Sequence, residues 1–135
     1  MKYYLAKTEP QEYSIDSLAK KGTDVWNGVR HPAAVMFLKQ MQNGDRVLIY
    51  HTGDEKAIVG LAEVVGNSRP DPNDSRSWLE DFKFIKKFEP PFVTLKEVKE
   101  SQKFPDFRLV REPRLSVMPV PDDFISWLRN KGVEV

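Results

Sequence analysis

Short apolar runs, separated by turn residues, divide the chain into segments that favour strands and segments that favour helices. Lys2–Lys7 and Thr23–Trp26 are rich in aromatic or β-branched residues, so each is expected to form a strand. Arg46–His51 and Ala57–Val65 are two longer apolar runs, and the polar stretch between them predicts a β-hairpin. Phe82–Phe88 alternates apolar and basic residues in part, which is typical of a half-exposed strand.

Capping residues and apolar positions three or four apart predict the helices. A serine before Ile15–Lys20 and a proline before Ala33–Met41 indicate where two helices begin. Thr94 opens a Thr-x-x-Glu capping box, which predicts a short helix behind it. A final amphipathic segment is expected to be capped by Asp122 or Asp123.

Two further segments complete the expected architecture. Asn67–Ser77 is polar and contains prolines, so it is expected to be a long loop that serves as a lid or binding loop. Arg114–Val117 is expected to be a last short strand. Five or six strands and three or four helices predict one α+β domain over residues 1–135, a small, mostly antiparallel β-barrel flanked by short helices.

Composition excludes several classes of site. The formal net charge of +1 excludes a basic coat over the whole surface and leaves room for a local basic groove. With no cysteine and two histidines, the chain lacks thiol nucleophiles, cysteine-based metal sites and three-histidine zinc sites, and no cofactor is expected. No apolar run approaches the roughly 20 residues of a membrane helix, and the start lacks a signal-peptide core. We therefore expect a cytoplasmic protein that does not enter a membrane.

One candidate catalytic group lies at the end of the strand predicted over Arg46–His51. Tyr50 and His51 are followed by Asp54 and Glu55, and a histidine beside carboxylates can serve as a general base. A histidine that only bonds the backbone at a strand end is the alternative.

A second polar group stands where the first strand ends. An activated Thr8, with Lys7 and Glu9 beside it, could hydrolyse an amide. Successive side chains on a strand point to opposite faces, so Lys7 and Thr8 are expected to share a pocket only if the strand bends. A polar strand end that leads into a turn is the alternative.

Two tryptophans stand at positions that a plain core does not explain. Trp26 directly precedes a tight Asn-Gly turn, and Trp78 follows the polar stretch. Two rings on two loops, with Asn27, Arg30 and His51 as hydrogen-bonding partners, would suit a flat heteroaromatic ligand such as a base.

Five groups of residues carry a family resemblance, in this order along nearly the whole chain: Lys7-Thr8-Glu9-Pro10; Val25-Trp26-Asn27-Gly28-Val29-Arg30; Gly44-Asp45 before Tyr50-His51; Val59-Gly60-Leu61-Ala62-Glu63-Val64; and Arg114-Leu115-Ser116-Val117. As a set they resemble the EVE domain. This resemblance implies a PUA-like fold, a β-barrel with flanking helices, similar to the YTH domains that read N-methylated adenine in RNA. It further implies a non-catalytic module that reads a modified base in nucleic acid, either a 5-modified cytosine in DNA or a methylated base in RNA.

The resemblance also implies which residues bind the ligand. Trp26 and Trp78 would be the rings of an aromatic cage, and Lys7 with Thr8 would close the pocket. Family members often carry Asp where Asn27 stands, and an amide both donates and accepts where a carboxylate only accepts, so the preferred base edge could differ. The full expected set is Lys7, Thr8, Trp26, Asn27, Arg30, Tyr50, His51, Trp78, Arg114 and Ser116.

Two other functions remain open at this stage. A small hydrolase on the same scaffold would use Lys7, Thr8 and a carboxylate, Glu9 or Glu63, on a modified nucleoside. An interaction subunit would keep the fold without a working pocket. For the base reader, affinity is expected to depend on phosphate contacts as well as on the pocket. The available basic residues are Arg30, Lys86, Lys87, Arg108, Arg111 and Arg114.

Overall fold

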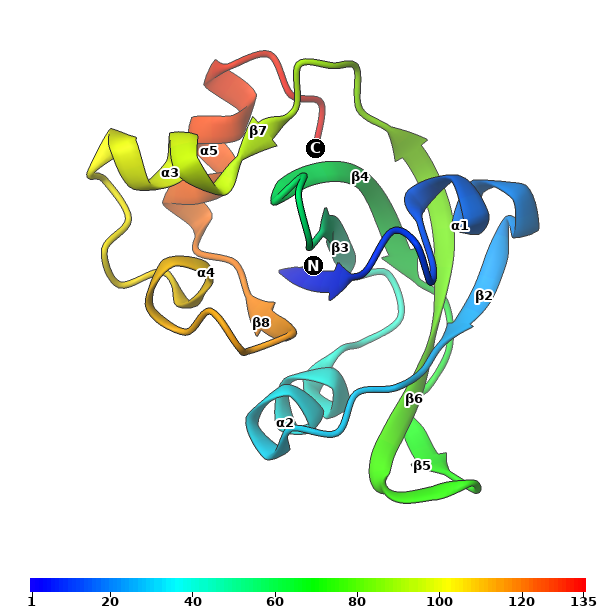
Figure 1. Ribbon diagram of the computed structural model, residues 1–135. Helices are drawn as coiled ribbons and strands as arrows, with labels where there is room; N and C mark the ends of the chain where they lie inside the picture. Colours follow the sequence, from blue (N-terminus) through cyan, green and yellow to red (C-terminus); the bar gives the residue numbers. More distant parts are fainter.

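Eight strands form one curled sheet, and five helices lie around it (Figure 1). The computed structural model describes all residues, 1–135. In chain order the elements are β1 (Tyr3–Thr8), α1 (Ile15–Lys21), β2 (Thr23–Trp26), α2 (Pro32–Gln40), β3 (Arg46–His51), β4 (Ala57–Val64), β5 (Arg69–Asp71), β6 (Asp74–Lys87), β7 (Val93–Thr94), α3 (Leu95–Ser101), α4 (Arg108–Arg111), β8 (Val117–Pro119) and α5 (Asp122–Asn130).

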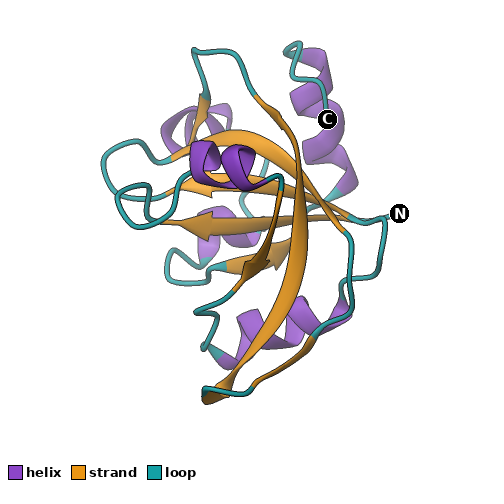
Figure 2. Ribbon diagram, turned by 90° about the vertical axis from the view of Figure 1, so that its right-hand side faces the viewer, coloured by secondary structure: helices purple, strands orange, loops and turns teal.

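The strand order is β2-β6-β4-β3-β1-β8, with β5 paired to β6 and β7 paired to β4. β1 and β3 run parallel, and every other pair is antiparallel. The 14-residue strand β6 curves along the height of the molecule (Figure 2). The predicted α+β class and the PUA-like, mostly antiparallel architecture are confirmed, and the structure adds two short strands, β5 and β7. The last strand, expected over Arg114–Val117, is instead β8 at Val117–Pro119, because the chain turns before it and the N–H of Leu115 donates to the carbonyl of Glu112 at 3.0 Å.

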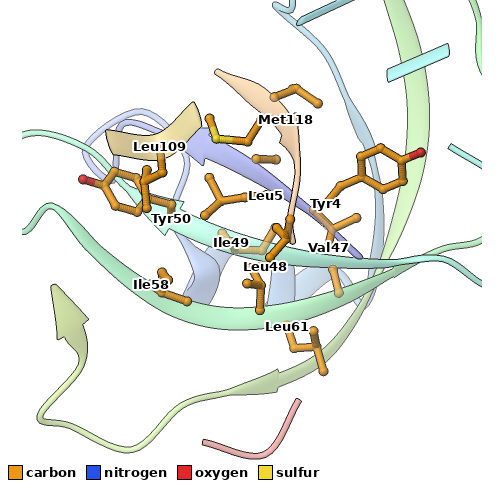
Figure 3. Close-up of a cluster of buried hydrophobic side chains, with 14 of the residues drawn as sticks. Tyr4, Leu5, Val47, Leu48, Ile49, Tyr50, Ile58, Leu61, Leu109 and Met118 are labelled. Atoms are coloured by element: carbon orange, nitrogen blue, oxygen red, sulfur yellow. The ribbon is translucent and has the colours of Figure 1, made fainter. Parts of the chain in front are cut away.

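The core fills the inside of the curl. β1 and β3 contribute side chains such as Leu5, Leu48 and Ile49, all at most 1% exposed, and Leu61 of β4 packs beside them (Figure 3). The central residues of β1 and β3 are buried on both faces of the sheet, which explains the unbroken apolar runs in these two strands. Helix α2 packs against both β8 and β6, so it bridges two sides of the curled sheet. None of the five helices is long and apolar enough to cross a membrane.

Local capping positions most of the helices as expected. The Ser14 hydroxyl accepts from the N–H of the third residue of α1, and the Thr94 hydroxyl accepts from the third N–H of α3. The expected cap of α5 is wrong: Pro121 occupies the N-cap position, because Asp122 and Asp123 already belong to the first helical turn. There the two carboxylates interact favourably with the helix dipole. The four-residue helix α4 was not expected, since it is too short for a periodic pattern.

The predicted loop Asn67–Ser77 is wrong. These residues form a β-hairpin, in which β5 pairs with the first part of β6 around a turn at Pro72 and Asn73. The N–H of Asn73 donates to Asp71 Oδ1 at 2.8 Å and stabilises the turn. Most of this hairpin is exposed to solvent, so its strands do not require one apolar face. The alternation of apolar and polar residues that would predict a strand is therefore missing from this part of the sequence.

Candidate functional site

An open cleft of about 540 Å³ lies where β1 and β2 end. Its volume falls within the roughly 300–1,000 Å³ range of small-molecule sites. The lining comes from the end of β1, the turn that follows it, the end of α1, β2 and the first residues after β2. The lining residues are Lys7, Thr8, Glu9, Glu12, Tyr13, Lys21, Asp24, Val25, Trp26, Asn27 and Gly28.

Trp26 belongs to the cleft and to the core at once. Its exposed fraction is 7%, because its ring packs against Phe82 of β6 at 5.1 Å between ring centroids. The ring of Tyr13 meets it edge-on, at 5.9 Å and 87°. The indole is therefore fixed in orientation by two aromatic neighbours and offers the cleft a rigid apolar surface.

Lys7 and Thr8 both line the cleft, although strand alternation predicts that they face opposite ways. The reason is that Thr8 is the last residue of β1, and the chain turns directly after it. The Thr8 hydroxyl donates to the carbonyl of Tyr13 at 2.6 Å. Lys7 Nζ donates to the carbonyl of Pro113 at 2.9 Å and lies 5.6 Å from the ring centroid of Tyr50, and burial lowers the pKa of Lys7.

Tyr13 and Asp24 form a hydrogen-bonded pair in the cleft that sequence reasoning missed. The Tyr13 hydroxyl donates to Asp24 Oδ2 at 2.5 Å, and burial together with this bond raises the pKa of Tyr13. Lys21 Nζ lies 3.9 Å from the same oxygen. Asp24 stands two residues before Trp26 on β2, so strand alternation places both on one face. That spacing is the signal that could have identified Asp24.

His51 lies outside the cleft lining and holds the start of α1 in place. It is 5% exposed, and its Nε2 accepts from the N–H of Ile15 at 3.0 Å. Its Nδ1 therefore carries the proton and donates to Glu55 Oε1 at 3.1 Å. The structure therefore supports the alternative reading of His51, in which this histidine bonds the backbone. Tyr50 is buried beside Lys7, and burial raises the pKa of Tyr50 to about 12.

Trp78 and Arg30 are also placed away from the cleft lining. The ring of Trp78, on β6, lies 4.1 Å from Lys39 Nζ of α2. Arg30 Nε donates to Asp74 Oδ2 at 2.5 Å, which ties the loop after β2 to the tip of the β5–β6 hairpin. The structure therefore does not bring Trp78 to the same cavity as Trp26.

Arg114 and Ser116 lie in the segment that leads into β8. The carbonyl of Ser116 accepts from the backbone N–H of Lys7 at 2.8 Å, so this segment supports the end of β1. Of the ten expected ligand-binding residues, the structure gathers four around the cleft, namely Lys7, Thr8, Trp26 and Asn27. Their role in binding stays a prediction.

The groups named for hydrolysis are only partly assembled. Glu9 lines the cleft, where its Oε2 accepts from the Thr52 hydroxyl at 3.3 Å. Glu63 lies on β4, paired in register with Arg46 and Lys83, and is not part of the lining. The Thr8 hydroxyl proton is directed at a backbone carbonyl rather than at a general base.

The charges of the lining favour a ligand that offers hydrogen-bond donors. Three carboxylates, those of Glu9, Glu12 and Asp24, stand against the two ammonium groups of Lys7 and Lys21. A phosphate would meet a net negative wall, whereas a neutral heteroaromatic ring with N–H groups would find acceptors. The cleft is therefore better suited to a base than to a nucleic-acid backbone.

Comparison with known proteins identifies the family. The EVE domain matches residues 2–131. Human thymocyte nuclear protein 1 is 26% identical to the chain, in an alignment that covers 96% of this chain and 74% of that protein. A protein of Agrobacterium tumefaciens is 32% identical, with a TM-score of 0.89 over 98% of this chain and 94% of that one. The crystal structure of human thymocyte nuclear protein 1 in complex with DNA containing 5-methylcytosine superposes with a TM-score of 0.87 at 21% identity, over 100% of this chain and 99% of that one. The chain belongs to the EVE domain family.

Proposed function

We propose that this protein is a non-catalytic module that binds DNA and takes a 5-modified cytosine from it into the cleft beside Trp26. The observation that carries the proposal is the cleft itself, in which a fixed indole ring stands among hydrogen-bonding groups. Membership of the EVE family supports it, as does the relative whose structure was solved with 5-methylcytosine-containing DNA. A methylated base in RNA is the competing ligand class.

The energetics of base binding fit a site of this kind. Stacking on an aromatic ring contributes roughly 1–3 kcal/mol per base, and extracting a base from a duplex costs a few kcal/mol. Stacking on Trp26 alone would therefore barely offset extraction, so hydrogen bonds from the lining must add to it. A buried methyl group contributes about 0.8 kcal/mol, which corresponds to a roughly fourfold preference for the methylated base.

A binding role is favoured over hydrolysis by the state of the polar groups. Thr8 donates to a backbone carbonyl, and the ammonium of Lys7 donates to another, so neither is arranged as a nucleophile and base pair. These residues are instead placed to hold the cleft in shape and to accept or donate hydrogen bonds.

The test is a fluorescence anisotropy titration with labelled DNA duplexes that differ only in one base, cytosine or 5-methylcytosine, at one salt concentration. We expect the wild-type protein to bind the methylated duplex about fourfold more tightly. Trp26→Phe keeps an aromatic core residue and reduces the stacking surface, so affinity should fall about fivefold, equivalent to about 1 kcal/mol. The matched control is Trp127→Phe, because Trp127 packs on α5 against Phe104 and Phe124, far from α1 and β2 (Figure 1).

Parallel titrations with RNA strands that carry methylated adenine or cytosine separate the two ligand classes. Tighter binding of an RNA member than of the methylated DNA would replace the DNA reader with an RNA reader. Equal affinity for every member, or unchanged binding by Trp26→Phe, would contradict a base-reading cleft.

A further inference from the structure

We infer that Asp24, positioned by Tyr13, determines which edge of a base the cleft accepts. Asp24 selects a ring that offers an amino group over a ring of the same shape that offers a carbonyl oxygen. The inference rests on the proposed function, because it concerns the specificity of that same cleft.

Asp24 is held at both carboxylate oxygens and still has acceptor capacity. Oδ2 accepts from the Tyr13 hydroxyl at 2.5 Å, and Oδ1 accepts from the N–H of Val25 at 2.8 Å. Each carboxylate oxygen can accept two hydrogen bonds. Lys21 Nζ, 3.9 Å from Oδ2, lies beyond hydrogen-bond distance, so each oxygen keeps one position open. The side chain is 22% exposed and lines the cleft, so a ligand can reach it.

Tyr13 fixes Asp24 relative to the ring on which a base would stack. Its own ring meets Trp26 edge-on at 5.9 Å, while its hydroxyl reaches Asp24. Asp24 and Trp26 also share one face of β2. The stacking surface and the acceptor are thus held in one rigid arrangement, and such preorganisation turns a hydrogen bond into a source of selectivity.

The other two carboxylates of the cleft are less suited to this role. Glu9 accepts from the Thr52 hydroxyl at 3.3 Å and from the N–H of Gln11 at 3.3 Å, both in neighbouring turns rather than in the aromatic wall. The carboxylate of Glu12 makes no hydrogen bond, and Glu12 is exposed, so its orientation is not fixed. Asp24 is the carboxylate that an aromatic side chain of the cleft holds in place.

The chemistry of the bases then determines the preference. 5-Methylcytosine and thymine have the same ring shape and the same methyl group. They differ at position 4, where cytosine carries an amino group and thymine a carbonyl oxygen, and at the neighbouring N3, which is an acceptor in cytosine and an N–H donor in thymine. A carboxylate placed against position 4 accepts from the amino group and repels the carbonyl oxygen. A site built around a hydrogen bond discriminates by larger factors than one methyl group does, because the wrong ligand sets its carbonyl oxygen against the carboxylate and forms no hydrogen bond in place of the one that is lost.

The experiment compares duplexes that carry 5-methylcytosine or thymine opposite the same abasic site, so that neither base is paired before extraction. We expect the wild-type protein to prefer 5-methylcytosine at least tenfold. Asp24→Asn should lower that preference below about threefold, because an amide can turn either a donor or an acceptor to the ligand. Tyr13→Phe keeps the contact with Trp26 but releases Asp24, and it should lower the preference to an intermediate value.

Asp16→Asn is the matched control. It removes one carboxylate from α1, where Asp16 pairs with Lys87 and is 68% exposed, outside the cleft. The preference for 5-methylcytosine over thymine should not change in this variant.

The inference would be overturned if Asp24→Asn and Tyr13→Phe kept the full discrimination against thymine. If the wild-type protein still preferred 5-methylcytosine to cytosine, the proposed function would stand. Failure of the wild-type protein to bind any of these duplexes would overturn both. Should Asp24→Asn fail to fold, as circular dichroism would reveal, Tyr13→Phe decides the question.

Discussion

At the scale of single residues, the most unusual group is Glu80, which stands directly behind the cleft. It is paired in register with Trp26 across β2 and β6, and it is 0% exposed. Its Oε1 accepts from the N–H of Asp81 at 2.8 Å, while Oε2 has no partner. Burial is the main reason that the pKa of Glu80 is raised above its ordinary value of 4.5. The surrounding core therefore disfavours the ionised form of the Glu80 carboxyl group.

This burial makes the stability of the fold depend on pH. Because the pKa of Glu80 is raised in the folded state, that state binds more protons than the unfolded chain between pH 4.5 and the raised value, and stability falls as the pH rises through this window. We expect Glu80→Gln to raise the free energy of unfolding at pH 7 and to change it much less at about pH 4, as measured by urea unfolding. Lower stability of the variant at pH 7 would contradict this account. The exposed carboxylate of Asp16 provides the control variant, Asp16→Asn.

The residues of the site could be predicted from the sequence only in part. Lys7, Thr8, Trp26 and Asn27 lie in family motifs and line the cleft. Tyr13 carries no signal in the sequence, because its role depends on a hydrogen bond to a residue eleven positions away, which forms only once the turn after β1 packs against β2. Conversely, the family motifs also include residues that do not line the cleft. His51 is one of them: it accepts a hydrogen bond from the backbone of α1 and so supports the cleft from outside.

At the scale of elements, one glycine of the sheet determines how closely helix α1 packs against it. A Cβ added at Gly60 of β4 would lie 2.5 Å from Ile15 Cδ1 and 2.9 Å from the carbonyl oxygen of Lys86. Ile15 is the first residue of α1 and is 1% exposed, so it cannot move aside without shifting the helix. The absence of a side chain at Gly60 thus sets how closely α1, and the cleft wall that precedes it, approach the sheet.

Gly60→Ala should therefore lower the free energy of unfolding by roughly 1–3 kcal/mol, the usual cost of overpacking a core. Gly66→Ala is the matched comparison, because there the added Cβ would meet the side-chain oxygen of Asp81 at 2.6 Å, and turning that carboxylate aside costs its partly exposed ion pair with Arg69 rather than a shift of a buried helix. We expect Gly66→Ala to cost less than Gly60→Ala in denaturant unfolding. Equal losses for the two variants would show that close packing of Ile15 is not what makes Gly60 necessary.

Which elements the sequence predicts depends on how local their causes are. The Ser14 and Thr94 caps and the β3–β4 hairpin follow from neighbouring residues, and all are confirmed. The parallel pairing of β1 with β3 joins residues about 43 positions apart, so no short pattern predicts it. The β5–β6 hairpin escaped prediction for a different reason, since its exposed strands show no apolar period.

At the scale of the whole molecule, most of the basic residues expected to contact phosphates are paired with acidic neighbours. Of the six basic residues expected to contact phosphates, five lie in ion pairs: Arg30 with Asp74, Lys86 with Glu134, Lys87 with Asp16, Arg108 with Glu112, and Arg111 with Asp106. Arg114 is exposed and makes no such pair. Of the six, Arg114 is therefore the one that can displace counterions from a nucleic acid without first giving up an ion pair.

The salt dependence of DNA binding should consequently be shallow. Each neutralised phosphate contributes about −0.9 to the slope of the logarithm of the association constant against the logarithm of salt concentration. We expect a slope no steeper than about −3, measured by anisotropy between roughly 50 and 300 mM salt. A slope of about −6 or steeper would mean that the ion pairs open on binding and that the backbone, rather than the cleft, dominates the affinity.

All residues that line the cleft lie between positions 7 and 28. The framework around them comes from much later in the chain, because Lys7 is bonded through its ammonium to Pro113 and through its backbone to Ser116. The segment that lines the cleft therefore cannot be transferred on its own. If it were grafted onto another protein, it would bring every lining side chain but not the later residues that hold those side chains in position. During synthesis, likewise, the first residues of the site to leave the ribosome must wait for nearly the whole chain before they reach their final positions.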